Sequence, residues 1–220
     1  MGKYKVGIET KEKIYETSKA LFYEKGYTNT TCAQIAKSSN SNVGLINYYF
    51  GAKSGLGIEV NNQLMRDFKA AILAKLKEAE IEASLLLQTT VEVRFLNQAL
   101  RQNKNYARFY YNLLEENVTY KQQSVMLDFY VNLAKSCQLD LEPYEIEHIT
   151  YANMGATQGV SLAYDAGLID CSPSEFVNMN IRMLFNNMHL DPDLIEQTLQ
   201  ESLEISKKIN VQIVKNFKVE

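Results

Sequence analysis

The 220-residue sequence predicts an all-α protein, and three observations support this. Apolar residues recur three and four positions apart along most of the chain, which is the spacing of one face of an α-helix. No stretch alternates convincingly between apolar and polar residues, as a half-buried strand does. The three prolines all lie in the C-terminal half, and two of them stand where helices are expected to begin.

The helices can be placed in order along the chain. A first helix is expected over about 10–25, where Ile14, Ser18, Leu21 and Phe22 form one face, and two short helical segments follow within 30–56. A long helix is expected over 53–78, because apolar residues recur there at steps of four. Further apolar faces predict helices near 86–100, 106–114, 126–133, 144–166, 173–188 and 192–216.

Composition restricts the class of protein. Hydrophobic residues make up 46% and charged residues 22% of the chain, which is ordinary for a globular protein. No apolar run approaches the length of a membrane-spanning helix, and the N-terminus lacks the apolar core of a signal peptide. Three cysteines do not make a disulfide framework, so we expect a reduced, cytoplasmic protein with no membrane partner.

Charge is distributed unevenly. Residues 1–60 hold eight lysines and five glutamates, whereas the other 160 residues carry 15 basic and 21 acidic groups. The net charge of -3 therefore combines a segment of +3 with a segment of -6. Either this contrast is chance, or the N-terminal part alone meets phosphates.

Capping residues define the two short helices. Thr31 and Gln34 form a capping box, which starts a helix with Ile35 and Ala36 as its buried positions. Asn40 is the best candidate for a left-handed turn residue. Asn42 is a good N-cap for the second helix, in which Ile46, Tyr49 and Phe50 face inward.

Helices this short are unstable alone, but packed across residues 10–25 they form a three-helix unit. That unit is typical of proteins that place one helix in the DNA major groove. An αα-hairpin without a role in DNA binding fits the same spacing.

A family resemblance supports the first interpretation. Residues 10–56, "TKEKIYETSKALFYEKGYTNTTCAQIAKSSNSNVGLINYYFGAKSGL", resemble the N-terminal domain of the TetR family of bacterial transcriptional regulators. Its anchors match in order and spacing: Ile14, Leu21-Phe22, Gly26-Tyr27, Thr30-Thr31, Ile35-Ala36, Gly44, Tyr48-Tyr49-Phe50, Lys53 and Leu56. The sequence departs from the family pattern at Asn40, Ser41, Asn47 and Val43, and Gly55 and Gly57 weaken the next helix by about 1 kcal/mol each.

The resemblance implies roles for individual residues. Asn42 to Tyr48 correspond to the recognition helix, in which Val43, Leu45 and Asn47 point toward base edges and Gly44 allows close approach. Asn47 is suited to adenine, and Val43 or Leu45 to a thymine methyl group. Thr31, Tyr48 and Lys53 match positions that hold the phosphate backbone.

The family also implies two domains, a helix-turn-helix domain over 1–55 and a ligand-binding and dimerisation domain over 56–220. Small residues on the 144–166 helix permit a close helix crossing, within a subunit or across the two-fold axis of a homodimer: Ala152, Ala156, Gly159 and Ala163. Four aromatic residues are either core residues or contacts to an unknown small-molecule effector: Tyr106, Phe109, Tyr110 and Tyr130.

Enzyme activity is not expected, and no catalytic residues, metal ligands or cofactors are assigned. Glu145 and His148 form a single E-x-x-H, whereas a di-iron bundle needs two, and His189 has no matching Glu. Phosphate-binding and nucleophile motifs are missing from the sequence. The preferred hypothesis is a ligand-released, homodimeric repressor on a palindromic operator of double-stranded DNA. The alternatives are a helical ligand-binding or protein-interaction module that does not bind DNA, and a metal-dependent helical enzyme.

Overall fold

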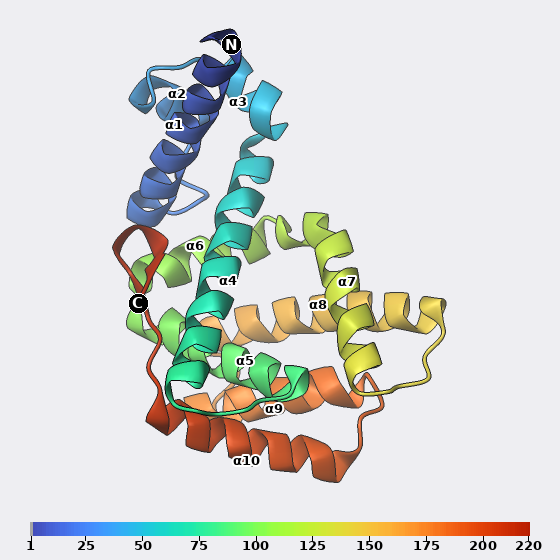
Figure 1. Cartoon of the computed structure of the whole chain (residues 1–220). Helices are drawn as coiled ribbons and strands as arrows, with labels where there is room; N and C mark the ends of the chain where they lie inside the picture. The colour runs from blue at the N-terminus through green and yellow to red at the C-terminus, as the bar shows by residue number, and fades with distance from the viewer. Residues whose placement is uncertain (1) are drawn as a thin grey trace. The chain divides into compact units, whose positions relative to one another are not determined.

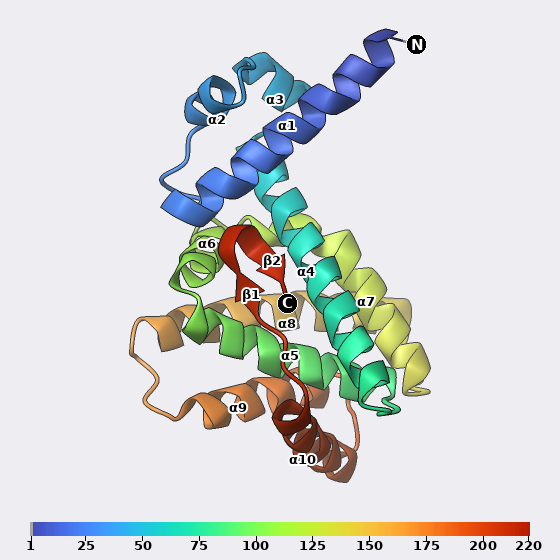
Figure 2. The same ribbon diagram turned by 60° about the vertical axis from the view of Figure 1, so that its left-hand side comes forward.

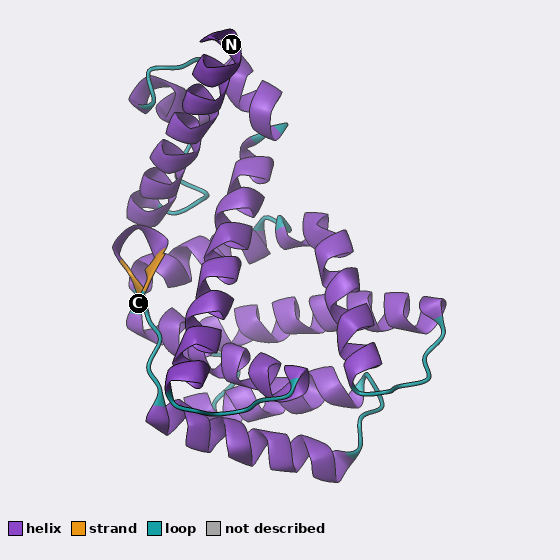
Figure 3. Ribbon diagram, in the orientation of Figure 1, coloured by secondary structure: helices purple, strands orange, loops and turns teal. Residues whose placement is uncertain are grey.

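The computed structural model describes residues 2–220, apart from the side chains of residues 2–5, 122 and 123. Lys3 and Lys5, counted above toward the N-terminal charge, therefore have side chains outside the described residues. The regular secondary structure of the described residues is helical except for one two-stranded hairpin, so the prediction of an all-α fold is confirmed (Figure 3).

The elements follow one another along the chain as labelled in Figure 1. Their bounds are α1 Gly2–Lys25, α2 Cys32–Ser38, α3 Val43–Phe50, α4 Lys53–Glu78, α5 Leu85–Gln102, α6 Lys104–Glu115, η1 Thr119–Gln122, α7 Gln123–Ser136, α8 Pro143–Asp165, α9 Pro173–Asn186, α10 Pro192–Lys208, β1 Ile213–Val214, η2 Lys215–Phe217 and β2 Lys218–Val219. Prolines occupy the first turn of α8, α9 and α10, where a missing N–H costs nothing.

Contacts between Cα atoms divide the chain into two compact units. The first unit comprises Met1–Asp67, Leu100–Lys121 and Ile213–Glu220, and the second comprises Phe68–Ala99 and Gln122–Gln212. The first boundary lies inside α4 and the next inside α5. The functional division at residue 55 stays a prediction.

The first unit joins α1, α2, α3 and the start of α4 to α6 and the C-terminal hairpin. Its core includes Ile14, Phe22, Ile46 and Phe109, none of which is accessible to solvent. The hairpin lies beside α1 and α6 (Figure 2), and Asn103 Nδ2 donates to the carbonyl of Ile213 at 2.8 Å. Segments from both ends of the chain therefore share one core.

The second unit is built on the packing of α7, α8, α9 and α10. A cluster of buried residues in this unit includes Leu133, Ile181 and Phe185. Arg94 from α5 is buried and ties the unit together, since it donates to Ser202 Oγ at 2.6 Å, to Asn178 Oδ1 at 2.7 Å and to the carbonyl of Leu199 at 2.9 Å.

The prediction of a helix over 192–216 was wrong at its C-terminal end. α10 ends at Lys208, and residues 213–219 form the antiparallel hairpin, in which Ile213 pairs with Val219. Ile209, Val211 and Ile213 are buried while Asn210 and Gln212 between them are exposed. This two-residue alternation is that of an extended chain and could have been read from the sequence.

Candidate DNA-binding surface

Local hydrogen bonds begin both α2 and α3, as the sequence predicts. Thr31 Oγ1 accepts from the amide of Gln34 at 3.2 Å, and Gln34 Oε1 accepts from the amide of Thr31 at 2.8 Å, which completes the capping box. Asn40 has a φ of 51°, in the left-handed region. Asn42 Oδ1 caps α3 by accepting from the amide of Leu45 at 3.0 Å. These caps satisfy amides that would otherwise have no partner.

One side of α3 is anchored and another is open to solvent. Ile46 is completely buried, while Tyr49 and Phe50 are half-buried. Asn42, Val43, Gly44, Asn47 and Tyr48 are exposed, with 79% of Tyr48 accessible, whereas Leu45 is half-buried. An eight-residue helix with one fully buried side chain is therefore held by its caps and by a single anchor.

The junction between α3 and α4 depends on two glycines. A Cβ at Gly55 would overlap the carbonyl oxygen of Phe50, and a Cβ at Gly57 would lie 2.7 Å from Cε2 of Tyr27. Both glycines therefore allow close approach of neighbouring groups at the start of α4. This compensates for their low helix propensity, which was the only effect visible in the sequence.

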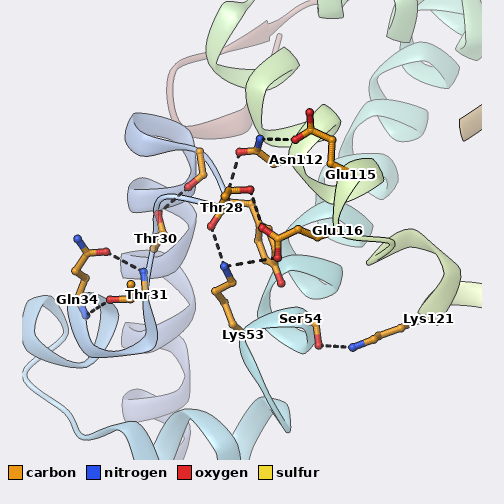
Figure 4. A network of polar contacts seen from close by, with 12 residues as sticks. Thr28, Thr30, Thr31, Gln34, Lys53, Ser54, Asn112, Glu115, Glu116 and Lys121 are labelled. Carbon is orange, nitrogen blue, oxygen red and sulfur yellow. Dashed lines mark hydrogen bonds and ion pairs between the residues drawn. The ribbon is translucent and has the colours of Figure 1, made fainter. Parts of the chain in front are cut away.

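Lys53 points into the first unit. Its Nζ donates to the carbonyl of Tyr27 at 3.2 Å, lies 4.1 Å from the centre of the Tyr27 ring, and lies 4.0 Å from Glu116 Oε2. Only 24% of its side chain is accessible. Burial, with a smaller contribution from Glu116, raises the pKa of Tyr27 to about 12, so the ring stays neutral. Figure 4 shows this network, which the sequence did not predict.

Helix α6 supplies the other half of the network. Glu116, which follows its last residue, accepts from Thr28 Oγ1 at 2.6 Å, and Asn112 Oδ1 accepts from the amide of Thr28 at 3.3 Å (Figure 4). Arg108 donates to the carbonyls of Tyr23 and Glu24, which have no helical partner at the end of α1. Sequence reasoning missed these residues because their partners lie about 85 positions away.

The aromatic residues suggested as effector contacts occupy two separate cores. Tyr106 and Phe109 are buried in the first unit, where the ring of Phe109 lies 4.8 Å from that of Phe217, and Tyr110 lies 6.1 Å from Tyr106. Tyr130 is buried in the second unit. The structure does not bring the four together in one unit, and their role in ligand binding stays a prediction.

The small residues of α8 lie toward the surface of the second unit. Ala152 and Gly159 are exposed, while Ala156 and Ala163 are half-buried. A Cβ at Gly159 would meet no atom within 4 Å. The side of α8 that carries these residues is therefore open for contact with another molecule.

Other site types receive no support from the described residues. No group of three histidine, cysteine, aspartate or glutamate side chains in this part of the chain is arranged to hold a metal ion. Cys32, Cys137 and Cys171 are free. Among the helices that the structure describes, none has the length and apolar character needed to cross a bilayer.

Comparisons with known proteins agree on the N-terminal region. Residues 14–60 match the family described as "Bacterial regulatory proteins, tetR family". The Bacillus subtilis (strain 168) protein named "Probable HTH-type transcriptional regulator YttP" is 47% identical over 49 residues, which cover 22% of this chain and 24% of that protein. The matched segment thus spans about a quarter of this relative.

Two solved structures are similar over most of the chain. A gamma-butyrolactone receptor (ArpA-like protein) is 12% identical, with 92% of this chain and 99% of that chain covered and a TM-score of 0.49. TylP, a tetR regulator from Streptomyces fradiae, is 19% identical, with 91% and 97% covered and a TM-score of 0.48.

Proposed function

We propose, from the match of residues 14–60, that the chain is a transcription regulator of the tetR family of bacterial regulatory proteins, and that it is a homodimeric repressor that a small ligand releases from DNA. The family is one of DNA-binding transcription regulators with a helix-turn-helix, in agreement with the prediction that the protein is not an enzyme. Homodimerisation, repression, the effector and the individual site residues are further parts of this proposal.

The observation that carries the proposal is the open face of α3. A helix capped by Asn42 and anchored by Ile46 presents Val43, Asn47 and Tyr48 to solvent, although two of these three are apolar or aromatic. Asn47 has the donor and acceptor pair that matches the major-groove edge of adenine. Val43 and Leu45 offer contacts for a thymine methyl group, and Gly44 leaves room for the backbone to approach the groove.

Phosphate contacts would position α3 in the groove. Thr31 at the start of α2 and Tyr48 on α3 are exposed, and both side chains carry hydroxyl groups that can donate to phosphate oxygens. Lys53 would supply the positive charge, after its ammonium group turns outward from Tyr27. These contacts fix register and supply salt-dependent affinity, whereas base contacts supply specificity.

A second copy of the chain would place two recognition helices on one duplex. Helices in successive major grooves must lie about 34–36 Å apart, and an operator for such a dimer is palindromic. We propose that the small-residue side of α8, formed by Ala152, Ala156, Gly159 and Ala163, lies at the two-fold axis together with α9. Met179 of α9, 54% accessible, adds apolar surface to this region.

The effector would act by favouring a conformation in which the two helices have the wrong separation. Helix α4 continues from the first unit into the second, and we propose it as the covalent path for this change. The domain boundary near residue 55 and the aromatic contacts proposed for the ligand, Tyr106, Phe109, Tyr110 and Tyr130, belong to this proposal.

An electrophoretic mobility-shift assay with the DNA upstream of the protein's own gene tests DNA binding. We expect Asn47→Ala to weaken binding about tenfold or more, because a bidentate base contact is worth about 1–3 kcal/mol. Asn210→Ala, at an exposed asparagine of the second unit outside α8 and α9, is the matched control and should bind as the wild type does. Equal binding by Asn47→Ala would exclude Asn47 as a base contact, whereas a wild-type protein that shows no salt-sensitive shift would favour the protein-interaction alternative.

Sedimentation analysis of Gly159→Leu tests the dimer. The added side chain meets open space within one chain, so it should leave the fold intact while blocking a close helix crossing between copies. We expect a monomer whose circular dichroism spectrum equals that of the wild type. A variant that remains dimeric would place the two-fold axis elsewhere.

A further inference from the structure

The geometry points to Glu116 as a positioning residue for DNA binding: its carboxylate holds the Lys53 ammonium inside the first unit, and binding requires Lys53 to leave it for a phosphate. This inference rests on the proposed DNA-binding function and adds a residue outside the helix-turn-helix. It concerns only contacts within the first unit.

The amino group of Lys53 has three partners on one side. They are the Tyr27 carbonyl at 3.2 Å, the Tyr27 ring at 4.1 Å, and Glu116 Oε2 at 4.0 Å. The first two are neutral, so Glu116 provides the only negative charge among them. A phosphate oxygen offers Lys53 the same kind of partner, a singly charged oxygen acceptor, and therefore competes with Glu116 for the ammonium group.

Glu116 is itself held in place. Its Oε1 accepts from Thr28 Oγ1 at 2.6 Å, which leaves Oε2 directed at Lys53 (Figure 4). Thr28 is in turn fixed by its own amide, which donates to Asn112 Oδ1. The carboxylate is thus positioned by two residues rather than reaching Lys53 as a free surface side chain, which reduces the entropy lost on pairing.

The ion pair between Lys53 and Glu116 is weak enough to break when Lys53 binds a phosphate. The Lys53 and Glu116 side chains are 24% and 38% accessible, so solvent screens the attraction and the ion pair is weak enough to exchange. Replacing the carboxylate by an amide removes the competing charge but keeps an acceptor for Thr28. We therefore expect Glu116→Gln to raise the affinity for DNA rather than lower it.

The test uses the full chain and a labelled duplex that binds in the mobility-shift assay above. Glu116→Gln should bind about two- to threefold more tightly per protomer, since an exposed pair is worth only a small factor. Glu115→Gln is the matched control, because it removes the same charge from the adjacent residue, which forms no ion pair with Lys53. Glu115 Oε2 accepts from Asn112 Nδ2 at 3.3 Å, and the glutamine keeps an acceptor for this bond. It reports the general electrostatic effect of one less negative charge.

Salt dependence separates a positioning role from a structural one. If Lys53 leaves Glu116 for a phosphate in each complex, the slope of log affinity against log salt should fall by about 0.9 per protomer in Lys53→Gln and stay unchanged in Glu116→Gln and Glu115→Gln. In a Lys53→Gln background, the two glutamine variants should become indistinguishable. Thermal melting of every variant confirms that the fold is retained.

Three results would overturn the inference: equal affinities for Glu116→Gln and Glu115→Gln, weaker binding by Glu116→Gln, or a difference that persists without Lys53. A wild-type protein that binds no duplex would instead reject the proposed function. The two failures are therefore distinguishable.

Discussion

Removal of the Phe217 ring should destabilise α1 and α6 in the first unit, although both helices lie far from residue 217 in the sequence. Phe217 is 1% accessible and lies edge-on to Tyr23 of α1 at 5.1 Å between ring centres, with Phe109 of α6 at 4.8 Å. Its backbone has a φ of 55°, a left-handed conformation that costs a bulky residue about 1–2 kcal/mol. Packing of the ring offsets that cost.

The expected loss follows from these contacts. Truncation of a buried phenylalanine to alanine costs about 3–5 kcal/mol. The loss is limited because a loosened hairpin can detach and relieve its backbone strain, so we expect a value near the lower end, about 3 kcal/mol. This corresponds to about a hundredfold change in an opening equilibrium.

Hydrogen exchange measured by mass spectrometry provides the assay. Amides near the C-terminal end of α1 and in α6 should exchange about a hundred times faster in Phe217→Ala, if opening limits their exchange. Lys218→Ala, at the exposed next residue, should leave these rates unchanged. Rates in Phe217→Ala within about threefold of the wild type would show that the ring does not support α1 and α6.

Three further changes test the packing. Gly57→Ala should destabilise the protein by about 1–2 kcal/mol in urea denaturation, because the added Cβ meets the Tyr27 ring and the overlap outweighs the gain in helix propensity. Arg94→Leu should cost about 2–4 kcal/mol in the same measurement, because it removes three hydrogen bonds that a buried guanidinium donates to Ser202, Asn178 and Leu199. Burial raises the pKa of Glu92, so the folded state binds more protons than the unfolded state and stability should fall as pH rises above about 4.5. Glu92→Gln should remove this decline in thermal melts at about pH 5 and about pH 7.5, and an equal decline in both proteins would refute the assignment.

The helix-turn-helix was predictable because its determinants are local. The capping box at Thr31, the left-handed Asn40 and the N-cap at Asn42 each depend on residues within three or four positions, and all three are confirmed. The buried face of α4 was likewise visible as a repeat of apolar residues at steps of four. Leu56, Val60, Leu64, Phe68, Ile72 and Leu76 are all at most 3% accessible.

The contacts of Lys53 could not be predicted, because they depend on how α6 packs. Nothing near Glu116 in the sequence distinguishes it from Glu115, yet the Glu116 carboxylate lies 4.0 Å from Lys53 Nζ, whereas the Glu115 carboxylate accepts from Asn112 Nδ2. The C-terminal hairpin was missed for a different reason. The helical pattern of α10 was extended past Lys208 although the buried residues beyond it alternate.

The place of Phe217 in the core bears on how the protein is made. A nascent chain emerges from the ribosome with its N-terminus first, so early segments ordinarily fold before later ones are synthesised. The rings of Tyr23 and Phe109 pack against Phe217, which is translated about a hundred codons after Phe109. The N-terminal helices are thus synthesised well before the residue that completes their core, so a nascent chain truncated before residue 217 would carry α3, the proposed recognition helix, on an incompletely packed first unit.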